Sequence, residues 1–270
     1  EKIAREICKK AKEAQLKDFQ ERMPDNKQGV EIEVNGVKYI AAIRRLTPQE
    51  CAELQTMPHD YEFVTSETQQ YKGFGNGWNI ETIKHIFNFI PKDKLNNLKV
   101  LSLFDGISGG QTALRGIGAN ITTYLASEID KYAIANTMHN FPNTIQLGSV
   151  TELNVDEIVE KYGVPDILIG GSPCQSFSFS GKMKGMSTKS GEEIYTLDRY
   201  LELKSQGFQF EGQSYLFWEY MRILTELRKY NPDIYFFLEN VKMLEKWERC
   251  LSHAIGVRGV HINSALVSAQ

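Results

Sequence analysis

The sequence has 270 residues, of which 41% are hydrophobic and 24% are charged, and this composition excludes disordered, collagen-like and low-complexity chains. A single hydrophobic core stops growing near about 250–300 residues, so we expect one large domain with at most a small satellite. The net charge of −3 gives no overall basic signature of the kind that many nucleic-acid-binding proteins carry, although it leaves room for a local basic face.

The cysteines are scattered along the chain without the spacing of a metal site or a disulfide framework. They are Cys8, Cys51, Cys174 and Cys250. We therefore expect free thiols in a reducing cytosol, with no bound metal. The sequence has no run of about 18 apolar residues that could span a membrane, and no signal peptide is recognisable.

The first 43 residues predict a helix followed by a hairpin. Apolar residues at helical spacing predict an amphipathic helix over 1–22, and turn-forming residues predict a loop after it, so we group 1–28 as an N-terminal segment. Alternating apolar residues over 30–43 surround Asn35-Gly36, the usual signal of a two-stranded hairpin.

Two helices with a glycine-rich approach are predicted next. The run Thr47-Pro48-Gln49-Glu50 has the capping pattern of a helix start, and we expect that helix to end by Pro58. Glycines at 73, 75 and 77 predict a loop. A helix over 80–89 and a short polar connector at 91–97 follow.

From residue 98 onward, apolar runs of strand length alternate with helical segments. The predicted strands are 100–104, 121–127, 166–170, 233–238 and 261–267. The predicted helices are 111–115, 131–140, 156–162, 214–230 and 243–253. Such alternation, with nearly uninterrupted apolar strands, is typical of an α/β fold with a doubly wound, mostly parallel sheet. Functional residues in such folds lie beyond the carboxyl ends of the strands.

The first two strands end in residues that suit a nucleoside-containing cofactor. Residues 104–110, Phe-Asp-Gly-Ile-Ser-Gly-Gly, lead into a helix, where glycines admit a ligand close to the backbone and free amides attract polar groups. A plain tight turn explains these glycines equally well. About twenty residues on, the next strand ends at Ser127-Glu128-Ile129-Asp130, where an acid can bind ribose hydroxyls. A solvated carboxylate is the alternative interpretation of Glu128.

The next two long strands end in a cysteine and a carboxylate. Cys174 follows Ser172 and Pro173 and is a candidate nucleophile, although most lone cysteines are small buried side chains. Glu239 ends an apolar run, so desolvation should raise its pKa and favour the protonated, hydrogen-bond-donating form. A salt-bridged helix cap is the alternative for Glu239.

Four motifs in this order, Phe-Asp-Gly-x-x-Gly-Gly, Ser-Glu-Ile-Asp, Gly-Gly-Ser-Pro-Cys-Gln-Ser-Phe and Leu-Glu-Asn-Val, closely resemble those of the DNA cytosine-5 methyltransferase family. The resemblance implies the Rossmann-like fold of S-adenosylmethionine-dependent methyltransferases, with S-adenosylmethionine as methyl donor, S-adenosylhomocysteine as product and no metal. It implies transfer to carbon 5 of a cytosine that is flipped out of double-stranded DNA, through a covalent adduct of Cys174 with Glu239 as its partner.

The resemblance also assigns the binding residues. The cofactor pocket would be lined by Phe104, Asp105, Gly106, Ile107, Gly109, Glu128, Ile129, Ser149, Val150, Pro173 and Leu216, and covered by Asn76, Gly77 and Trp78. DNA contacts would come from Ser172, Gln175, Ser176, Lys182, Lys184, Asn240 and Gln270, although a plain solvated loop explains the lysines almost as well. The family often has Asp at the position of Ser149, so adenine recognition here is expected to be weaker or to use backbone groups.

The order of the motifs departs from the family. Residues 44–50 and 75–78 resemble the motifs that usually close the chain, yet they precede the first cofactor motif. We therefore expect a circular permutation, in which 29–92 corresponds to the family's usual C-terminal segment and packs on a catalytic core at 93–270.

The closing residues depart from the family as well. Residues 262–270 resemble the start of a motif that continues Gln-x-Arg-x-Arg, and neither these arginines nor a target-recognition domain is among the 270 residues. The alternative to a complete enzyme is therefore a non-catalytic or incomplete subunit that needs a recognition domain or second polypeptide; a methyltransferase of RNA cytosine is a third interpretation. We expect a cytoplasmic, nucleoid-associated protein of a bacterial or phage-infected cell, with restriction–modification and regulation both open as its role.

Overall fold

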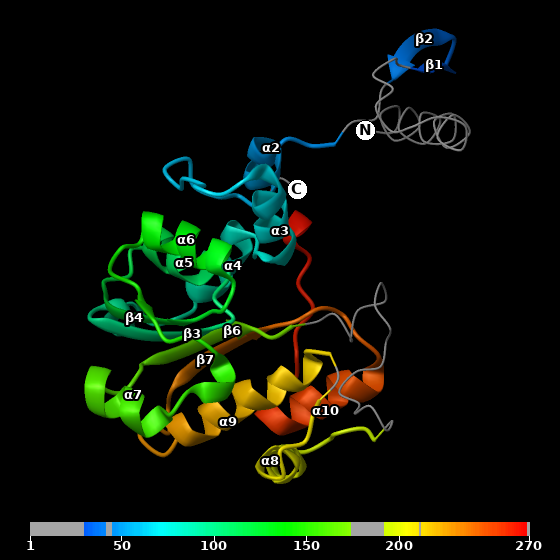
Figure 1. Ribbon diagram of the computed structural model, residues 1–270. Coiled ribbons are helices and arrows are strands. Elements are labelled where there is room, and N and C mark those ends of the chain that lie inside the picture. Colours follow the sequence, from blue (N-terminus) through cyan, green and yellow to red (C-terminus); the bar gives the residue numbers. More distant parts are fainter. Residues whose placement is uncertain (1–29, 42–44, 174–191, 211, 269–270) are drawn as a thin grey trace. The chain divides into compact units, whose positions relative to one another are not determined.

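The computed structural model describes residues 30–41, 45–173, 192–210 and 212–268 (Figure 1). The chain divides into two units, Glu1–Glu50 and Cys51–Gln270. The helix predicted over 1–22 lies outside the described residues.

The first unit contains a β-hairpin. Strands β1 (Val30–Val34) and β2 (Val37–Ala41) pair antiparallel, with Val34 opposite Val37. Asn35 and Gly36 turn the chain at φ values of 54° and 77°, the left-handed pair that a two-residue type I′ turn requires. The predicted hairpin is therefore confirmed.

Helix α2 (Pro48–Leu54) begins with the predicted capping box. The Glu50 backbone N–H donates to Thr47 Oγ1 at 3.2 Å, and the Thr47 backbone N–H donates to Glu50 Oε2 at 2.8 Å. Each side chain thus satisfies one backbone donor that the helix itself leaves unpaired.

The second unit is built on a five-stranded parallel sheet in the order β5-β4-β3-β6-β7. The strands are β3 (Leu98–Leu103), β4 (Ile121–Ser127), β5 (Ile145–Gln146), β6 (Ile167–Gly171) and β7 (Tyr235–Glu239). The chain proceeds outward from β3 to β5 and then returns to place β6 on the other side of β3. This reversal is the topological switch point of a doubly wound fold, where ligands bind beyond the strand ends.

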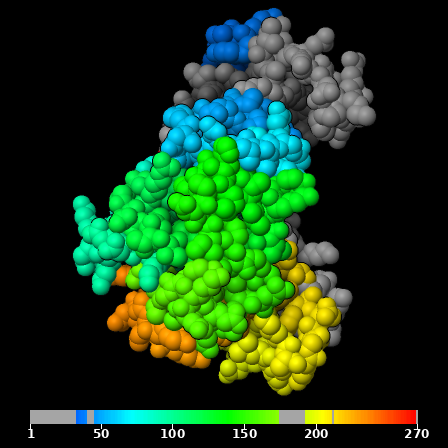
Figure 2. All heavy atoms as spheres, turned by 60° about the vertical axis from the view of Figure 1, so that its left-hand side comes forward, coloured from blue at the N-terminus to red at the C-terminus, as the bar shows by residue number. Residues whose placement is uncertain are grey.

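Helices cover both faces of the sheet (Figure 1). One face carries α3 (Glu67–Asn76), α4 (Ile80–Phe87), α5 (Gly109–Gly116) and α6 (Lys131–Asn140); the other carries α7 (Val155–Tyr162), α9 (Phe217–Leu227) and α10 (Glu245–Ile255), with α8 (Leu197–Ser205) next to α9. Figure 2 shows the surface from another side, with the green residues between the cyan ones and the orange and yellow ones. The predicted α/β fold with a doubly wound parallel sheet is confirmed.

Alternate residues of the central strands serve two separate hydrophobic clusters. Leu101, Leu103 and Leu168 pack into the cluster on the α9 side, whereas Val100 and Ile169 pack into the cluster on the α4 side. Since successive side chains of a strand point to opposite faces, a strand that is buried on both faces is apolar throughout. This is why the sequence shows uninterrupted apolar runs.

The predicted loop at Gly73, Gly75 and Gly77 is wrong in part, because α3 continues through the first two of these glycines. A Cβ on Gly73 would lie 3.1 Å from Cγ2 of Ile107. Gly73 is therefore used for close packing of this helix against the loop after β3.

The predicted strand at 261–267 is also wrong. Asn263 instead accepts a hydrogen bond from the Ala265 backbone and caps the short 3₁₀ turn η4 (Ser264–Leu266). Leu266 is 84% exposed, so this apolar run does not face the core. The sequence pattern did not predict α8, which begins where Thr196 caps the Arg199 backbone N–H. Within the described parts of the chain, no helix has both the length and the apolar character needed to cross a membrane.

Candidate active site

The turn between β3 and α5 is held by a buried carboxylate. Asp105 accepts hydrogen bonds from the hydroxyls of Ser102 and Ser108, each at 2.6 Å, and of Tyr124 at 2.8 Å. Burial raises the pKa of Asp105 to about 6 although the three hydroxyls lower it. The side chain of Asp105 thus organises the turn from inside.

The backbone of this turn is left-handed at three alternate positions. Phe104, Gly106 and Ser108 have φ values of 57°, 57° and 59°. Left-handed conformations at residues other than glycine cost free energy and cluster at ligand sites. The turn therefore has the strained, closely folded backbone that is typical of a binding loop, and its shape depends on the buried hydroxyls.

Glu128 joins the end of β4 to this turn. Its Oε2 accepts from the Gly106 backbone N–H, and its Oε1 accepts from the backbone N–H groups of Ile129 and Asp130, all at 2.8 Å. Because a carboxylate oxygen has two lone pairs, Oε2 keeps the capacity for a further donor. Ile129 beside it is 72% exposed, so an apolar side chain stands next to a carboxylate that can accept another hydrogen bond.

Residues from the region before β3 close over the turn. The Tyr61 hydroxyl donates to the Ile107 carbonyl at 2.9 Å, and the Ile107 side chain packs between Gly73 and Gly77. Gly109, at the start of α5, faces Ile80 and Trp78. The segment predicted to cover the cofactor therefore packs on the turn predicted to bind it.

Trp78 also reaches the carboxylate at the end of β7. Its indole Nε1 donates to Oε2 of Glu239 at 3.2 Å, although the two residues are 161 positions apart. Burial raises the pKa of Glu239 and the Trp78 donor lowers it. The expected upward direction of the Glu239 pKa is thus supported, and the tryptophan is a partner that the sequence analysis missed.

The ends of β6 and β7 are tied to each other. Gly171 lies opposite Glu239 in the parallel register, and the Asn240 side-chain amide donates to Ser172 Oγ at 2.9 Å. Ser172 is buried. Both residues were predicted to contact DNA, and their side chains pair with each other beside Pro173.

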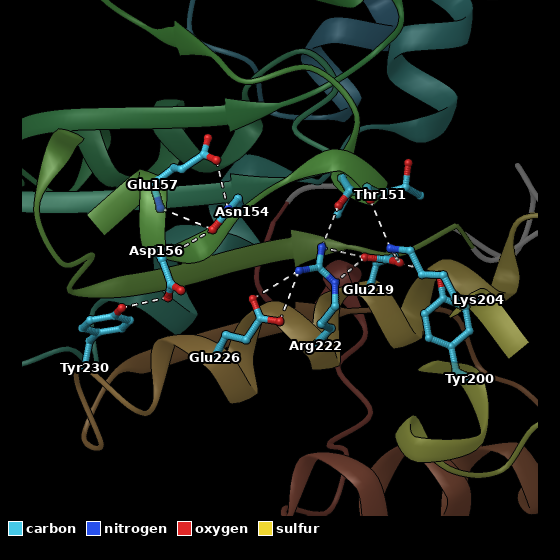
Figure 3. A network of polar contacts seen from close by, with 11 residues as sticks. Thr151, Asn154, Asp156, Glu157, Tyr200, Lys204, Glu219, Arg222, Glu226 and Tyr230 are labelled. Carbon is cyan, nitrogen blue, oxygen red and sulfur yellow. Dashed lines mark hydrogen bonds and ion pairs between the residues drawn. The ribbon is translucent and has the colours of Figure 1, made fainter. Parts of the chain in front are cut away.

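A turn after β5 is held by two partly buried cations (Figure 3). Ser149 caps the 3₁₀ turn η2 (Val150–Glu152) through its own hydroxyl. The Arg222 guanidinium donates to the Val150 carbonyl at 3.2 Å, and Lys204 Nζ donates to the Thr151 carbonyl at 3.1 Å. The cofactor residues predicted at 149 and 150 therefore belong to a turn that two cations hold by its carbonyls.

Glu219 of α9 holds these two cations in place. Its side chain is fully buried, and its two oxygens accept from Lys204 at 2.5 Å, from Arg222 at 2.8 Å and from the Tyr200 hydroxyl at 2.5 Å. A buried carboxylate is tolerated only when it is paired and hydrogen-bonded. No periodicity in the sequence indicates this network, since its members come from two different helices.

The predicted site residues divide into three groups. Most of them lie at the carboxyl end of the sheet or in the segment that covers it. These are Phe104, Asp105, Gly106, Ile107, Gly109, Glu128, Ile129, Ser149, Val150, Ser172, Pro173, Glu239, Asn240, Gly77 and Trp78. Asn76 is exposed at the end of α3, and Leu216 is half-buried in the 3₁₀ turn η3 (Ser214–Leu216). Cys174, Gln175, Ser176, Lys182, Lys184 and Gln270 lie outside the described residues.

The family model of the C-5 cytosine-specific DNA methylases matches residues 2–92 and 98–255. The chain belongs to this family. Its members are methyltransferases.

Relatives of this methyltransferase chain come from phages and plants. An orphan methyltransferase, M.Rho11sI of Bacillus phage rho11s, is 38% identical over 44% of this chain and 23% of its own length. The DNA (cytosine-5)-methyltransferase DRM2 of Arabidopsis thaliana is 27% identical over 68% of this chain and 28% of its own length. The chain thus spans about a quarter of the length of these relatives.

Among solved structures, DNMT2 of Spodoptera frugiperda is similar to this methyltransferase chain with 22% sequence identity and a TM-score of 0.40, over 59% of this chain and 40% of that one. Among the described residues, no cluster of His, Cys, Asp and Glu has the make-up of a metal site.

Proposed function

We propose that the chain carries the methyl-transfer centre of a DNA cytosine-5 methyltransferase, with Cys174 as nucleophile and Glu239 as the acid. The observation that carries the proposal is the register of β6 and β7. Gly171, the last residue of β6, lies opposite Glu239, and burial raises the pKa of the Glu239 carboxyl group. Cys174 follows Gly171 by three residues in the sequence.

These two groups suit the chemistry of cytosine. Carbon 5 of cytosine is a poor nucleophile, but addition of the Cys174 thiolate to carbon 6 makes an enamine whose carbon 5 can attack an electrophilic methyl group. A protonated Glu239 donates to ring nitrogen 3 and quenches the negative charge that develops on the ring. Loss of the carbon-5 proton and elimination of Cys174 then release 5-methylcytosine. The base must leave the DNA stack first, because stacking covers carbon 6.

The residues present fit S-adenosylmethionine, which would supply the sulfonium methyl group when bound. Glu128 retains an acceptor for ribose hydroxyls, and the exposed Ile129 beside it offers an apolar surface for adenine. The left-handed turn around Gly106 would hold the methionine end. Pro173 and Leu216 would complete the pocket, under the segment from Asn76 to Trp78.

The test is transfer of a tritiated methyl group from S-adenosylmethionine to duplex DNA. We expect C174A to abolish transfer and E239Q to lower its rate by about 10²–10⁴-fold, the usual contribution of a general acid. C250A is the matched control, since burial raises the pKa of the Cys250 thiol to about 11 and this thiol stays protonated. Transfer that survives in C174A would refute the proposal.

The alternative that the sequence analysis left open is an incomplete subunit that requires another polypeptide to read DNA. Under this proposal, purified chain transfers no methyl group to DNA although it binds S-adenosylhomocysteine. Methyl transfer to duplex DNA without any added polypeptide would rule it out. Double-stranded DNA as the partner, and the cytoplasm as the location, stay predictions under both candidates.

A further inference from the structure

The Trp78 indole packs closely against two glycines, Gly110 in α5 and Gly171 at the end of β6. A Cβ added to Gly110 would lie 3.3 Å from Trp78 Cζ3, and a Cβ added to Gly171 would lie 3.0 Å from Trp78 Nε1. The ring also meets Phe237 edge-on, with 5.4 Å between the ring centroids. Glycine at these two positions is what allows an indole to extend from the start of α5 to the end of β7.

This placement fixes the direction of the Trp78 N–H. The indole nitrogen is a donor only, and it points to Oε2 of Glu239. The Cβ position at Gly171 is within 3.1 Å of the same oxygen. Trp78 and Glu239 thus meet above a backbone that has no side chain to separate them.

We propose that Trp78 is a positioning residue for Glu239: its N–H keeps Oε2 as the accepting oxygen, so that the proton of the neutral acid resides on Oε1 and is presented to the target base. This inference rests on the proposed function and assigns Trp78 a role beyond cofactor binding. The carbonyl oxygen of a carboxylic acid is a better acceptor than its hydroxyl oxygen, so a fixed donor at Oε2 selects one of the two positions of the proton. The remaining lone pair of Oε2 suits the exocyclic amine of cytosine.

The other described groups that pack against β7 contact atoms other than the carboxyl oxygens of Glu239. From α9, the Tyr220 hydroxyl donates to the Phe237 carbonyl at 3.1 Å, and the Arg228 guanidinium lies over the Phe236 ring with 5.3 Å to its centroid. From β6, Gly171 offers only backbone. Cys174, on the segment that follows, is outside the described residues. Among the described residues, burial raises the pKa of Glu239 and the Trp78 donor lowers it.

The matched pair of variants is W78F and W218F. Phe keeps an aromatic ring at position 78 but has no N–H. Trp218 is a fully buried tryptophan whose indole N–H has no hydrogen-bond partner among the described residues, so W218F removes a buried indole without removing such a bond. G171A is a second test, because its Cβ would push the Trp78 and Glu239 groups apart.

The first readout does not depend on activity. The full chain is labelled with ¹³C at the glutamate carboxyl groups, the Glu239 signal is identified by its loss in E239Q, and its titration midpoint is measured. Loss of a donor to the charged form raises a carboxyl pKa, so we expect W78F and G171A to titrate at higher pH than the wild type and W218F to match it. An unchanged or lower midpoint in W78F, or in G171A if W78F fails to fold, overturns the inference.

The second readout is the pH profile of methyl transfer. If transfer requires the protonated acid, its alkaline limb moves to higher pH in W78F, while the maximal rate falls because the proton is no longer confined to one oxygen. A changed midpoint in a protein without transferase activity would refute the proposed function and leave the Trp78–Glu239 link standing. An active protein in which W78F leaves the Glu239 midpoint unchanged would refute the Trp78–Glu239 link and leave the proposed function standing.

Discussion

Replacing Asp105 by Asn should change how the stability of the protein depends on pH. The pKa of this buried carboxyl group is raised from 3.8 to about 6. The folded protein therefore holds the Asp105 proton up to about pH 6, whereas the unfolded chain releases it near pH 3.8. As a result, this group lowers the free energy of unfolding as pH rises through the window between the two values.

The magnitude follows from the size of the shift. At about 1.4 kcal/mol for each pKa unit, the rise to about 6 corresponds to a loss of about 3 kcal/mol that is complete above this window. Asn at position 105 does not titrate. The free energy of unfolding of D105N minus that of the wild type should therefore rise by about 2 kcal/mol between pH 4 and pH 6.5, the part of the full loss that falls in this range, whatever its value at pH 4.

Urea unfolding followed by circular dichroism at several pH values measures this difference. D130N is the control with the opposite sign. Lys72 lowers the pKa of Asp130 through a hydrogen bond and its charge, so the Asp130 contribution to stability is present above the unfolded pKa and is lost as pH falls. The difference for D130N should fall as pH rises. A D105N difference that stays flat, or that follows D130N, would refute the assignment of Asp105 as a desolvated acid.

Two further substitutions test the buried charge network around Glu219 and the proposed ribose-binding role of Glu128. E219Q should lower the free energy of unfolding by about 3–5 kcal/mol, because it leaves Lys204 and Arg222 without their buried counter-charge. The control is E226Q on the same helix, which should cost about 1 kcal/mol or less because the Glu226 carboxylate is 31% exposed. Equal costs of the two substitutions in urea unfolding would contradict the buried network. E128Q should weaken the binding of S-adenosylhomocysteine at least about tenfold in calorimetry, because a hydrogen bond to a charged group contributes about 1.5 kcal/mol or more. An unchanged dissociation constant would show that Glu128 does not bind the ribose.

The parallel strands and the residues at their ends could be predicted because they depend on local pattern. Runs such as Val100–Leu103 are apolar throughout since both faces of the sheet are covered, and parallel strands bring their carboxyl ends to one edge. The strand expected at 261–267 was wrong because an apolar run forms a strand only where the fold supplies a neighbour to pair with. Gly73 was misjudged for a related reason, since its packing against Ile107 is a tertiary contact.

The partners of the site residues could not be predicted from the sequence. Tyr124 reaches Asp105 from the neighbouring strand, and Trp78 reaches Glu239 from 161 residues away. Neither contact follows from a helical or strand period. The motifs identify the candidate carboxylates, whereas the groups that shift the pKa values of Asp105 and Glu239 are brought to them by the fold.

The central claim is that Cys174 attacks a cytosine that Glu239 protonates. The most direct measurement is trapping on duplex DNA that carries 5-fluorocytosine, with S-adenosylmethionine present. Fluorine at carbon 5 cannot leave as a proton does, so the adduct between enzyme and base persists and migrates as a covalent complex in a denaturing gel. We expect this complex with the wild type and with C250A, and none with C174A. The account would be contradicted if C174A formed the covalent complex. It would also be contradicted if a protein that transfers the methyl group formed no complex.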